Sequence, residues 1–123
     1  MYANQHIEVK LQTEISRKPL LSALIEGGQF TDHVEIREIR FGPGQQTGLH
    51  RHPCPVLGYV AKGTILFQVD GEPAKTLCEG DAFFEPANRK VLHFDNASRT
   101  EPATFIALYL LGAGEDELIE MLR

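Results

Sequence analysis

Gly44-Gln45-Gln46-Thr47-Gly48-Leu49-His50-Arg51-His52-Pro53 is the most informative stretch of this chain. It lies between a glycine-rich bend and a strand-like run. If a strand begins at His50, the two-residue period of side chains puts His50 and His52 on one face and Arg51 on the other. Two imidazoles on one face can bind a single metal ion, each through a nitrogen about 2.0–2.1 Å from it. The stretch therefore predicts a metal site, and the sequence around it sets the context.

Size and charge exclude several classes of protein. The chain has 123 residues, enough for one domain with a substantial core. Its formal net charge of -5 leaves no basic stripe to neutralise phosphates, which argues against a nucleic-acid partner.

Neither a membrane nor a secretory pathway is indicated. The apolar run from Phe105 to Leu111 is too short to cross a bilayer. No apolar signal core follows a basic start at the N-terminus. We therefore expect a cytoplasmic protein with no membrane partner, in which Cys54 and Cys78 stay reduced.

Short β-type segments separated by glycine and proline predict a sandwich or barrel. The expected strands are residues 33–41, 56–61, 64–69, 75–78, 82–85, 91–95 and 104–111. In the first, Val34 and Ile36 fall on one face but Ile39 and Phe41 on the other, which predicts a β-bulge between them. Residues 18–26 fit either a strand or a short helix. Residues 115–122 predict a short C-terminal helix, with acids at its start and Arg123 after its end.

The motifs resemble those of the cupin superfamily. The first cupin motif runs Gly, five residues, His-x-His, three or four residues, Glu, six residues, Gly. The chain places Gly44, His50, His52 and Gly63 in register, with Val56 at the Glu position.

The second cupin motif is degenerate here. Gly80 and Pro86 match it, whereas Asn88, Val91 and Asp95 stand at or near its inner Gly, His and Asn positions. The resemblance covers about residues 34–111. It implies one cupin domain over residues 1–123, an all-β double-stranded β-helix, or jelly-roll barrel, of the RmlC-like type.

The resemblance also implies a metal site of three histidines and one glutamate around Fe, Mn, Ni, Cu or Zn. Val56 and Val91 cannot bind metal, but His93 lies two residues beyond Val91 and should share its face. We predict a displaced site in which His50, His52 and His93 hold one divalent transition metal, Zn, Ni, Fe or Cu. The alternative is that His93 lines the pocket and is satisfied by a hydrogen bond.

Val56, Gly58 and Val91 are the predicted lining of a substrate pocket. Val56 and Gly58 are small and apolar and should share a face with the metal site, which would leave space there. The alternative is that a large neighbour such as Phe67 or Phe83 fills the gap.

Four further residues have two interpretations each. Cys54 is either a reactive thiol or a small residue in a stiff loop between prolines. Glu85 would be a general acid or base if it turned inward, but its place before Pro86 predicts exposure. Arg89 and Lys90 either receive an anionic substrate at the barrel mouth or are solvated.

Three functions remain open, and no catalytic residue is assigned. The first is a metal-binding cupin acting on a small organic molecule, as an oxygenase or a Lewis-acid isomerase or lyase. The second is a non-catalytic cupin that binds a small ligand and has a lost or weak metal site. The third is a metal-independent isomerase, which needs a His base, a carboxylate behind it and a Tyr acid, Tyr59 or Tyr109.

A homodimer is the expected assembly. Strand 104–111 is apolar on both faces and, with outward residues of strand 91–95 such as Phe94, could supply the interface.

Overall fold

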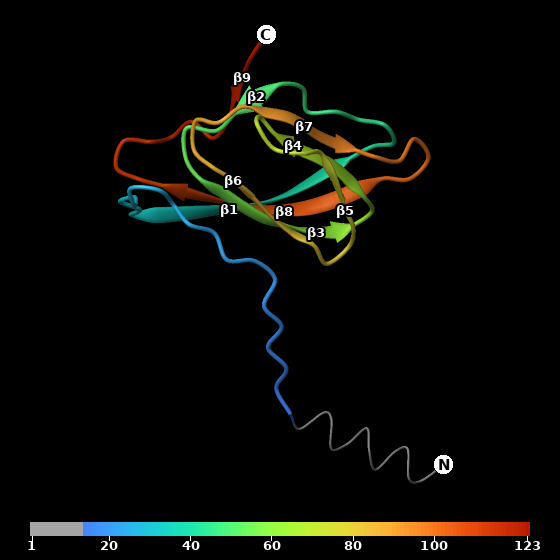
Figure 1. Cartoon of the computed structure of the whole chain (residues 1–123), viewed down its shortest axis with the longest axis horizontal. Coiled ribbons are helices and arrows are strands. Elements are labelled where there is room, and N and C mark those ends of the chain that lie inside the picture. The colour runs from blue at the N-terminus through green and yellow to red at the C-terminus, as the bar shows by residue number, and fades with distance from the viewer. Residues whose placement is uncertain (1–13) are drawn as a thin grey trace.

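The computed structural model describes residues 14–123, which form two antiparallel sheets that face each other (Figure 1). One sheet has the strand order β1-β8-β3-β6 and the other β5-β4-β7-β2-β9. The strands are β1 His33–Phe41, β2 His50–Arg51, β3 Val56–Lys62, β4 Ile65–Val69, β5 Lys75–Leu77, β6 Ala82–Glu85, β7 Val91–Asn96, β8 Ala103–Leu111 and β9 Glu120–Met121. The prediction of an all-β cupin barrel is confirmed.

The core lies between the sheets and is dominated by aromatic rings. Phe94 from β7 lies 4.7 Å from Phe105 and 4.8 Å from Phe83, measured between ring centroids. Tilted and edge-on contacts at this spacing suit the charge distribution of aromatic rings. Only 3% of Phe94 is exposed, so the expectation that it points outward to a partner is wrong.

No bulge interrupts the pairing of β1 with β8, which runs without a shift from His33↔Leu111 to Phe41↔Ala103. The predicted bulge is therefore absent. Ile39 and Phe41 pack on the core from the inner face of β1, whereas Val34 and Ile36 lie exposed on its outer face. Register shifts occur instead between β3 and β8 and between β4 and β7.

The predicted C-terminal helix is also absent from the described residues. Residues 115–119 have no regular structure, and β9 then pairs with β2 through His50↔Met121 and Arg51↔Glu120. Eight residues make too few backbone hydrogen bonds to hold a helix alone, and here the strand edge of β2 offers partners. Residues 18–26, the ambiguous segment, form neither a strand nor a helix and end in a turn at Glu26.

Residues 14–123 include no helix that is long and apolar enough to cross a membrane. His33 lies at the surface, beside Asp32, as expected for a histidine without a functional partner. His6, which also had no predicted partner, lies outside the described residues.

Candidate metal centre

A row of four inward-facing residues crosses the four-stranded sheet at the site. Strand pairing sets Glu35 of β1 opposite Tyr109 of β8, Tyr109 opposite Val56 of β3, and Val56 opposite Glu85 of β6. Glu85 is only 3% exposed. The expectation that Glu85 is exposed is therefore wrong, because the alternation of β6 puts Phe83 and Glu85 together on the inner face.

His50 and His52 approach Glu85 from the second sheet. Both imidazoles are buried, 2% and 5% exposed, and their centroids lie 5.0 Å apart. The candidate ligand atoms of His50, His52 and Glu85 all lie within 4.8 Å of one another. Within the described chain, this is the only group of three or more His, Cys, Asp or Glu side chains that could hold a metal ion.

Hydrogen bonds to backbone carbonyls fix the orientation of the two imidazole rings. Nδ1 of His50 lies 2.7 Å from the carbonyl oxygen of Gly48, and Nδ1 of His52 lies 2.6 Å from that of Leu118. An Nδ1–H that donates to a carbonyl leaves Nε2 as the ligating nitrogen, which is the arrangement typical of metal-bound histidines. Two imidazole nitrogens and one carboxylate are also a donor set suited to a transition metal. The residues present therefore fit a metal ion.

The side chains of His52 and Glu85 are in direct contact. Nε2 of His52 lies 2.6 Å from Oε2 of Glu85, and both side chains are buried. Burial lowers the pKa of His52, but the hydrogen bond to Glu85 and its negative charge outweigh burial, so the net pKa is raised. Burial dominates at His50 and lowers its pKa, although the Gly48 carbonyl and Glu85 oppose it.

His93 is not part of this cluster. Its pairing with Gln68, while Val91 pairs with Val69, leaves Leu92 as an extra residue in β7. The extra residue reverses the alternation, so Val91 is buried but His93 is exposed and hydrogen-bonded through Nδ1 to Asp95 at 2.9 Å. The structure therefore does not bring His93 to His50 and His52, and the third side chain that it places beside them is Glu85.

Glu85 lies directly across the sheet from the position at which the first cupin motif has its glutamate. Val56 occupies the Glu position of the first cupin motif, and Val56 and Glu85 are direct partners in the β3–β6 pair. Directly opposed residues have Cβ atoms about 4.5–5.5 Å apart, so a carboxylate from either strand can reach the same space. The signal that could have found Glu85 was the pairing of strands 56–61 and 82–85, in register.

A cavity of about 280 Å³ adjoins the cluster. Val56 is on its wall, as predicted, but Gly58 and Val91 are not among the residues that line it. A Cβ on Gly58 would meet Cζ of Phe83 at 2.0 Å, so the Phe83 ring fills the space above this glycine. The cavity is lined by Arg37, Ile39, Phe41, Thr47, His50, His52, Val56, Phe83, Glu85, Phe94, Phe105, Ala107, Tyr109, Leu118 and Ile119.

Arg37 and Tyr109 bring polar groups to this cavity. Arg37 pairs with inward-facing Ala107, which puts it on the inner face of β1. The Tyr109 ring lies edge-on to His52 at 5.9 Å. Burial raises the pKa of Tyr109, the charge of Glu85 adds to this, and Arg37 opposes it. Tyr59, the other candidate acid, is exposed on the opposite face of the sheet.

The C-terminal segment completes the cavity wall. Leu118 and Ile119 line it, and the Leu118 carbonyl accepts the hydrogen bond from His52. Arg51 holds the segment through a two-bond ion pair with Glu120, with N–O distances of 2.9 and 3.2 Å. The segment that was predicted to be a helix, residues 115–122, therefore holds His52, a candidate metal ligand, in position.

Arg89 and Lys90, which were predicted to lie at the barrel mouth, do not line the cavity. Arg89 pairs with Glu72 and donates to the Asp70 carbonyl, and both Arg89 and Lys90 are exposed. They fit the interpretation as solvated loop residues.

The two cysteines are free, Cys54 buried and Cys78 exposed. Burial, with a contribution from the charge of Glu115, raises the pKa of the Cys54 thiol to about 11. Because the thiolate is the reactive form, we expect native protein at about pH 8 to expose about one titratable thiol per chain, and about two after unfolding. A chromogenic disulfide reagent checks this, with Cys78→Ser as control. Rapid reaction of a second thiol in the native protein would contradict the burial of Cys54.

Comparison with known proteins agrees with this architecture. None of the curated proteins matches the chain in sequence. A cupin-like protein from Thermotoga maritima MSB8 is 28% identical, with a TM-score of 0.62 over 79% of this chain and 68% of the other. One DMSP lyase structure is 27% identical, with a TM-score of 0.61 over 73% of this chain and 44% of the other.

An oxalate oxidase bound to the substrate analogue glycolate is 22% identical, with a TM-score of 0.62 over 72% of this chain and 46% of the other. The chain thus spans less than half the length of the lyase and oxidase structures. The sequence pattern of the Cupin domain family matches residues 37–109, more than half of the chain. With the two sheets and the neighbouring His50 and His52, this match shows that the chain belongs to the cupin family.

Proposed function

We propose that this cupin holds one divalent transition metal through His50, His52 and Glu85 and acts on a small organic carboxylate. The convergence of the three side chains, with both Nδ1 atoms already bound to carbonyls, carries the proposal. Imidazole and carboxylate donors suit Zn, Ni, Fe or Cu. When bound, such an ion supplies a Lewis acid that polarises a substrate oxygen.

Arg37 supports a carboxylate as the substrate class. Among the residues that line the cavity, it is the only arginine or lysine, and it lies on the wall formed by β1. A guanidinium can hold a carboxylate through two parallel hydrogen bonds. Glycolate, the analogue bound to the similar oxalate oxidase, is such an acid. A cavity of about 280 Å³ limits the substrate to a small molecule.

Tyr109 is the group placed to move a proton at the substrate. Its raised pKa keeps the phenol protonated at neutral pH, so its hydroxyl can donate to an oxygen of a bound acid. A proton donor next to a Lewis-acid site favours isomerase or lyase chemistry within this proposal. The DMSP lyases, which are similar to this chain in fold, carry the name of such a reaction class.

The metal-independent isomerase is less well supported by the geometry. A histidine base needs one free nitrogen toward the substrate and a carboxylate on its far side. In His52, however, Nδ1 is bound to Leu118 and Nε2 is bound to Glu85, so neither nitrogen is free. His50 keeps Nε2 available, but its Nδ1 partner is the Gly48 carbonyl and not a carboxylate.

Elemental analysis tests the metal. Tag-free protein purified without chelators should contain about one transition metal per chain. A content below about a tenth of an equivalent, unchanged after incubation with Zn, Ni, Fe and Cu in turn, would leave the alternative of a non-catalytic, metal-free cupin that binds a small ligand. Activity that persists after chelation would instead support the metal-independent isomerase.

Arg37→Met tests the substrate class. We expect the substitution to weaken binding of the best acid from a panel of small mono- and dicarboxylates by about tenfold or more. Calorimetry on metal-loaded protein measures this. Arg40→Met is the matched control, because Arg40 lies on the same strand but on its outer face. Equal losses in the two variants would mean that Arg37 acts only through the net charge.

A further inference from the structure

Two opposite charges lie side by side on β1, next to the cavity. Glu35 and Arg37 both point to the inner face of the four-stranded sheet, because they are two residues apart on the strand. β1 contributes Arg37, Ile39 and Phe41 to the lining of the cavity. Glu35 is not among the lining residues. It is therefore the next inward residue beyond Arg37, on the side away from the aromatic core.

Glu35 is the partner of Arg37 within residues 14–123. Nη2 of Arg37 lies 3.3 Å from Oε1 of Glu35, and the Arg37 side chain forms no other hydrogen bond or ion pair with these residues. Charge-assisted hydrogen bonds are usually about 2.7–2.9 Å long, so this contact is a long one. The side chains of Arg37 and Glu35 are 55% and 41% exposed, which screens their attraction. Another anion can therefore replace Glu35 at Arg37.

Most of the donors of Arg37 are left for a ligand. A guanidinium has five N–H groups on three nitrogens, and the contact with Glu35 uses one nitrogen. Opposite Arg37 on β8 is Ala107, which also lines the cavity and has only a methyl side chain. A carboxylate in the cavity can form two parallel hydrogen bonds with a guanidinium, and Glu35 does not form such a pair.

The charge of Glu35 acts on the rest of the site as well. Glu35 is the direct partner of Tyr109, and Glu85 lies on the other side of Tyr109 in the row across the sheet. Burial is the main cause of the raised pKa of Tyr109; the charges of Glu85 and Glu35 add to it, and that of Arg37 opposes it. When Glu85 binds a metal ion its charge is offset, and Glu35 remains as the carboxylate that repels an incoming anion.

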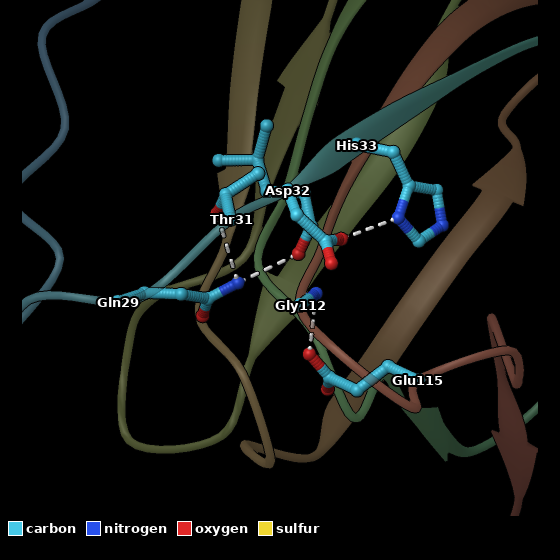
Figure 2. Close-up of polar contacts among 7 residues, drawn as sticks. Gln29, Thr31, Asp32, His33, Gly112 and Glu115 are labelled. Carbon is cyan, nitrogen blue, oxygen red and sulfur yellow. Dashed lines mark hydrogen bonds and ion pairs between the residues drawn. The ribbon is translucent and has the colours of Figure 1, made fainter.

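The backbone that carries the pair is fixed at the start of β1. Figure 2 shows the polar contacts around this point, with Asp32 beside His33 and Gly112 beside Glu115. The Asp32 amide donates to the Leu111 carbonyl at 3.0 Å, and the pairing of β1 with β8 continues from there without a shift. The side chains of the pair can therefore change partners while the strand stays in place.

We propose that Glu35 is bound to Arg37 while the cavity is empty and that the carboxylate of the substrate displaces it. This inference rests on the proposed function, because it needs a substrate carboxylate that binds at Arg37. Glu35 is then a specificity-determining residue that lowers the affinity for every acid by the strength of the pair. An uncharged analogue does not displace Glu35, so its affinity does not depend on this residue.

Calorimetric titration of metal-loaded protein with glycolate, and with its uncharged amide glycolamide, tests the exchange. We expect Glu35→Gln to bind glycolate about threefold to fivefold more tightly than the wild-type protein, because it no longer competes for Arg37. Binding of glycolamide should not change. Glu38→Gln is the matched control, because it removes the same charge from the outer face of β1. Equal gains in the two variants would show that only the net charge matters and would overturn the proposal.

The double variant Glu35→Gln/Arg37→Met separates this inference from the proposed function. If Glu35 acts by holding Arg37, its substitution in the Arg37→Met background should give no larger gain than Glu38→Gln gives there. A full gain in that background would overturn the exchange. Weaker glycolate binding in Arg37→Met without a gain in Glu35→Gln would overturn the exchange alone and leave the substrate class standing. Absence of glycolate binding in both the wild-type protein and Glu35→Gln, with thermal melting showing folded proteins, would overturn both.

Discussion

Glu85→Gln is expected to lower metal affinity by about a hundredfold or more. The amide cannot supply the negative charge that the carboxylate gives to the cluster, and the buried His52 loses its ionic partner. The double variant His50→Ala/His52→Ala should reduce the metal content below about a tenth of an equivalent per chain. Elemental analysis after dialysis against a single metal, together with competition against a chromogenic chelator, measures both effects.

His93→Ala is the matched control for these variants. His93 is a histidine of the same barrel, but its side chain lies at the surface and is hydrogen-bonded to Asp95. Its removal should therefore leave metal content and affinity unchanged. If His93→Ala lost the metal and Glu85→Gln kept it, the originally predicted three-histidine site would be correct and the carboxylate would have no role as ligand.

Exchanging the side chains of Val56 in β3 and Glu85 in β6 tests the geometry further. Val56→Glu alone places a second carboxylate beside Glu85, whereas Val56→Glu/Glu85→Val moves the carboxylate to the opposing position. The double variant should recover much of the metal binding that Glu85→Val loses, because directly opposed side chains reach the same space. No recovery in a folded double variant would show that the position of the carboxylate along the barrel matters as well as its presence.

Gly58→Ala is expected to have the largest effect on stability. The new Cβ would lie 2.0 Å from Cζ of Phe83 and 2.5 Å from the backbone carbonyl oxygen of Ile106. The ring is part of the aromatic core and the carbonyl belongs to β8, so neither can retreat cheaply. We expect a loss of about 3 kcal/mol in the free energy of unfolding and a melting temperature lower by roughly 10 °C.

Gly42→Ala is the control for this substitution. At Gly42 the nearest atom to a new Cβ is the end of the Gln45 side chain at 3.6 Å, an ordinary contact. We expect a change of less than about 0.5 kcal/mol. Urea unfolding followed by circular dichroism measures both variants. A Gly58→Ala protein as stable as Gly42→Ala would mean that Phe83 has space to move, and that the cavity can extend to Gly58.

The strands were predictable because turn residues and alternation are local signals. Residues 33–41 and 82–85 were predicted with the bounds that the structure shows. The C-terminal segment was not, because its acidic start and apolar face fit a helix, whereas β9 forms by pairing with β2, about 70 residues earlier in the chain. That contact cannot be read from the segment itself.

Two of the three side chains of the candidate metal centre were predicted from the sequence. His50 and His52 were found because the motif spacing and their alternation are both local. His93 was chosen by parity, which fails when one extra residue, Leu92, lies between two paired positions. Glu85 was passed over because the residue before a proline at a strand end is commonly exposed. Its burial results from the pairing of β6 with β3, which is a property of the sheet.

Val56 and Glu85 face each other across β3 and β6, and this matters when cupins are compared by their linear sequence motifs. Position-by-position alignment scores Val56 as the loss of an acidic residue and Glu85 as an unrelated gain in another motif. In space the two residues face each other, and the carboxylate of Glu85 lies beside the two histidines. A chain whose first motif lacks its glutamate can therefore still place a carboxylate beside its two histidines, and facing strand positions are better compared as one shared site.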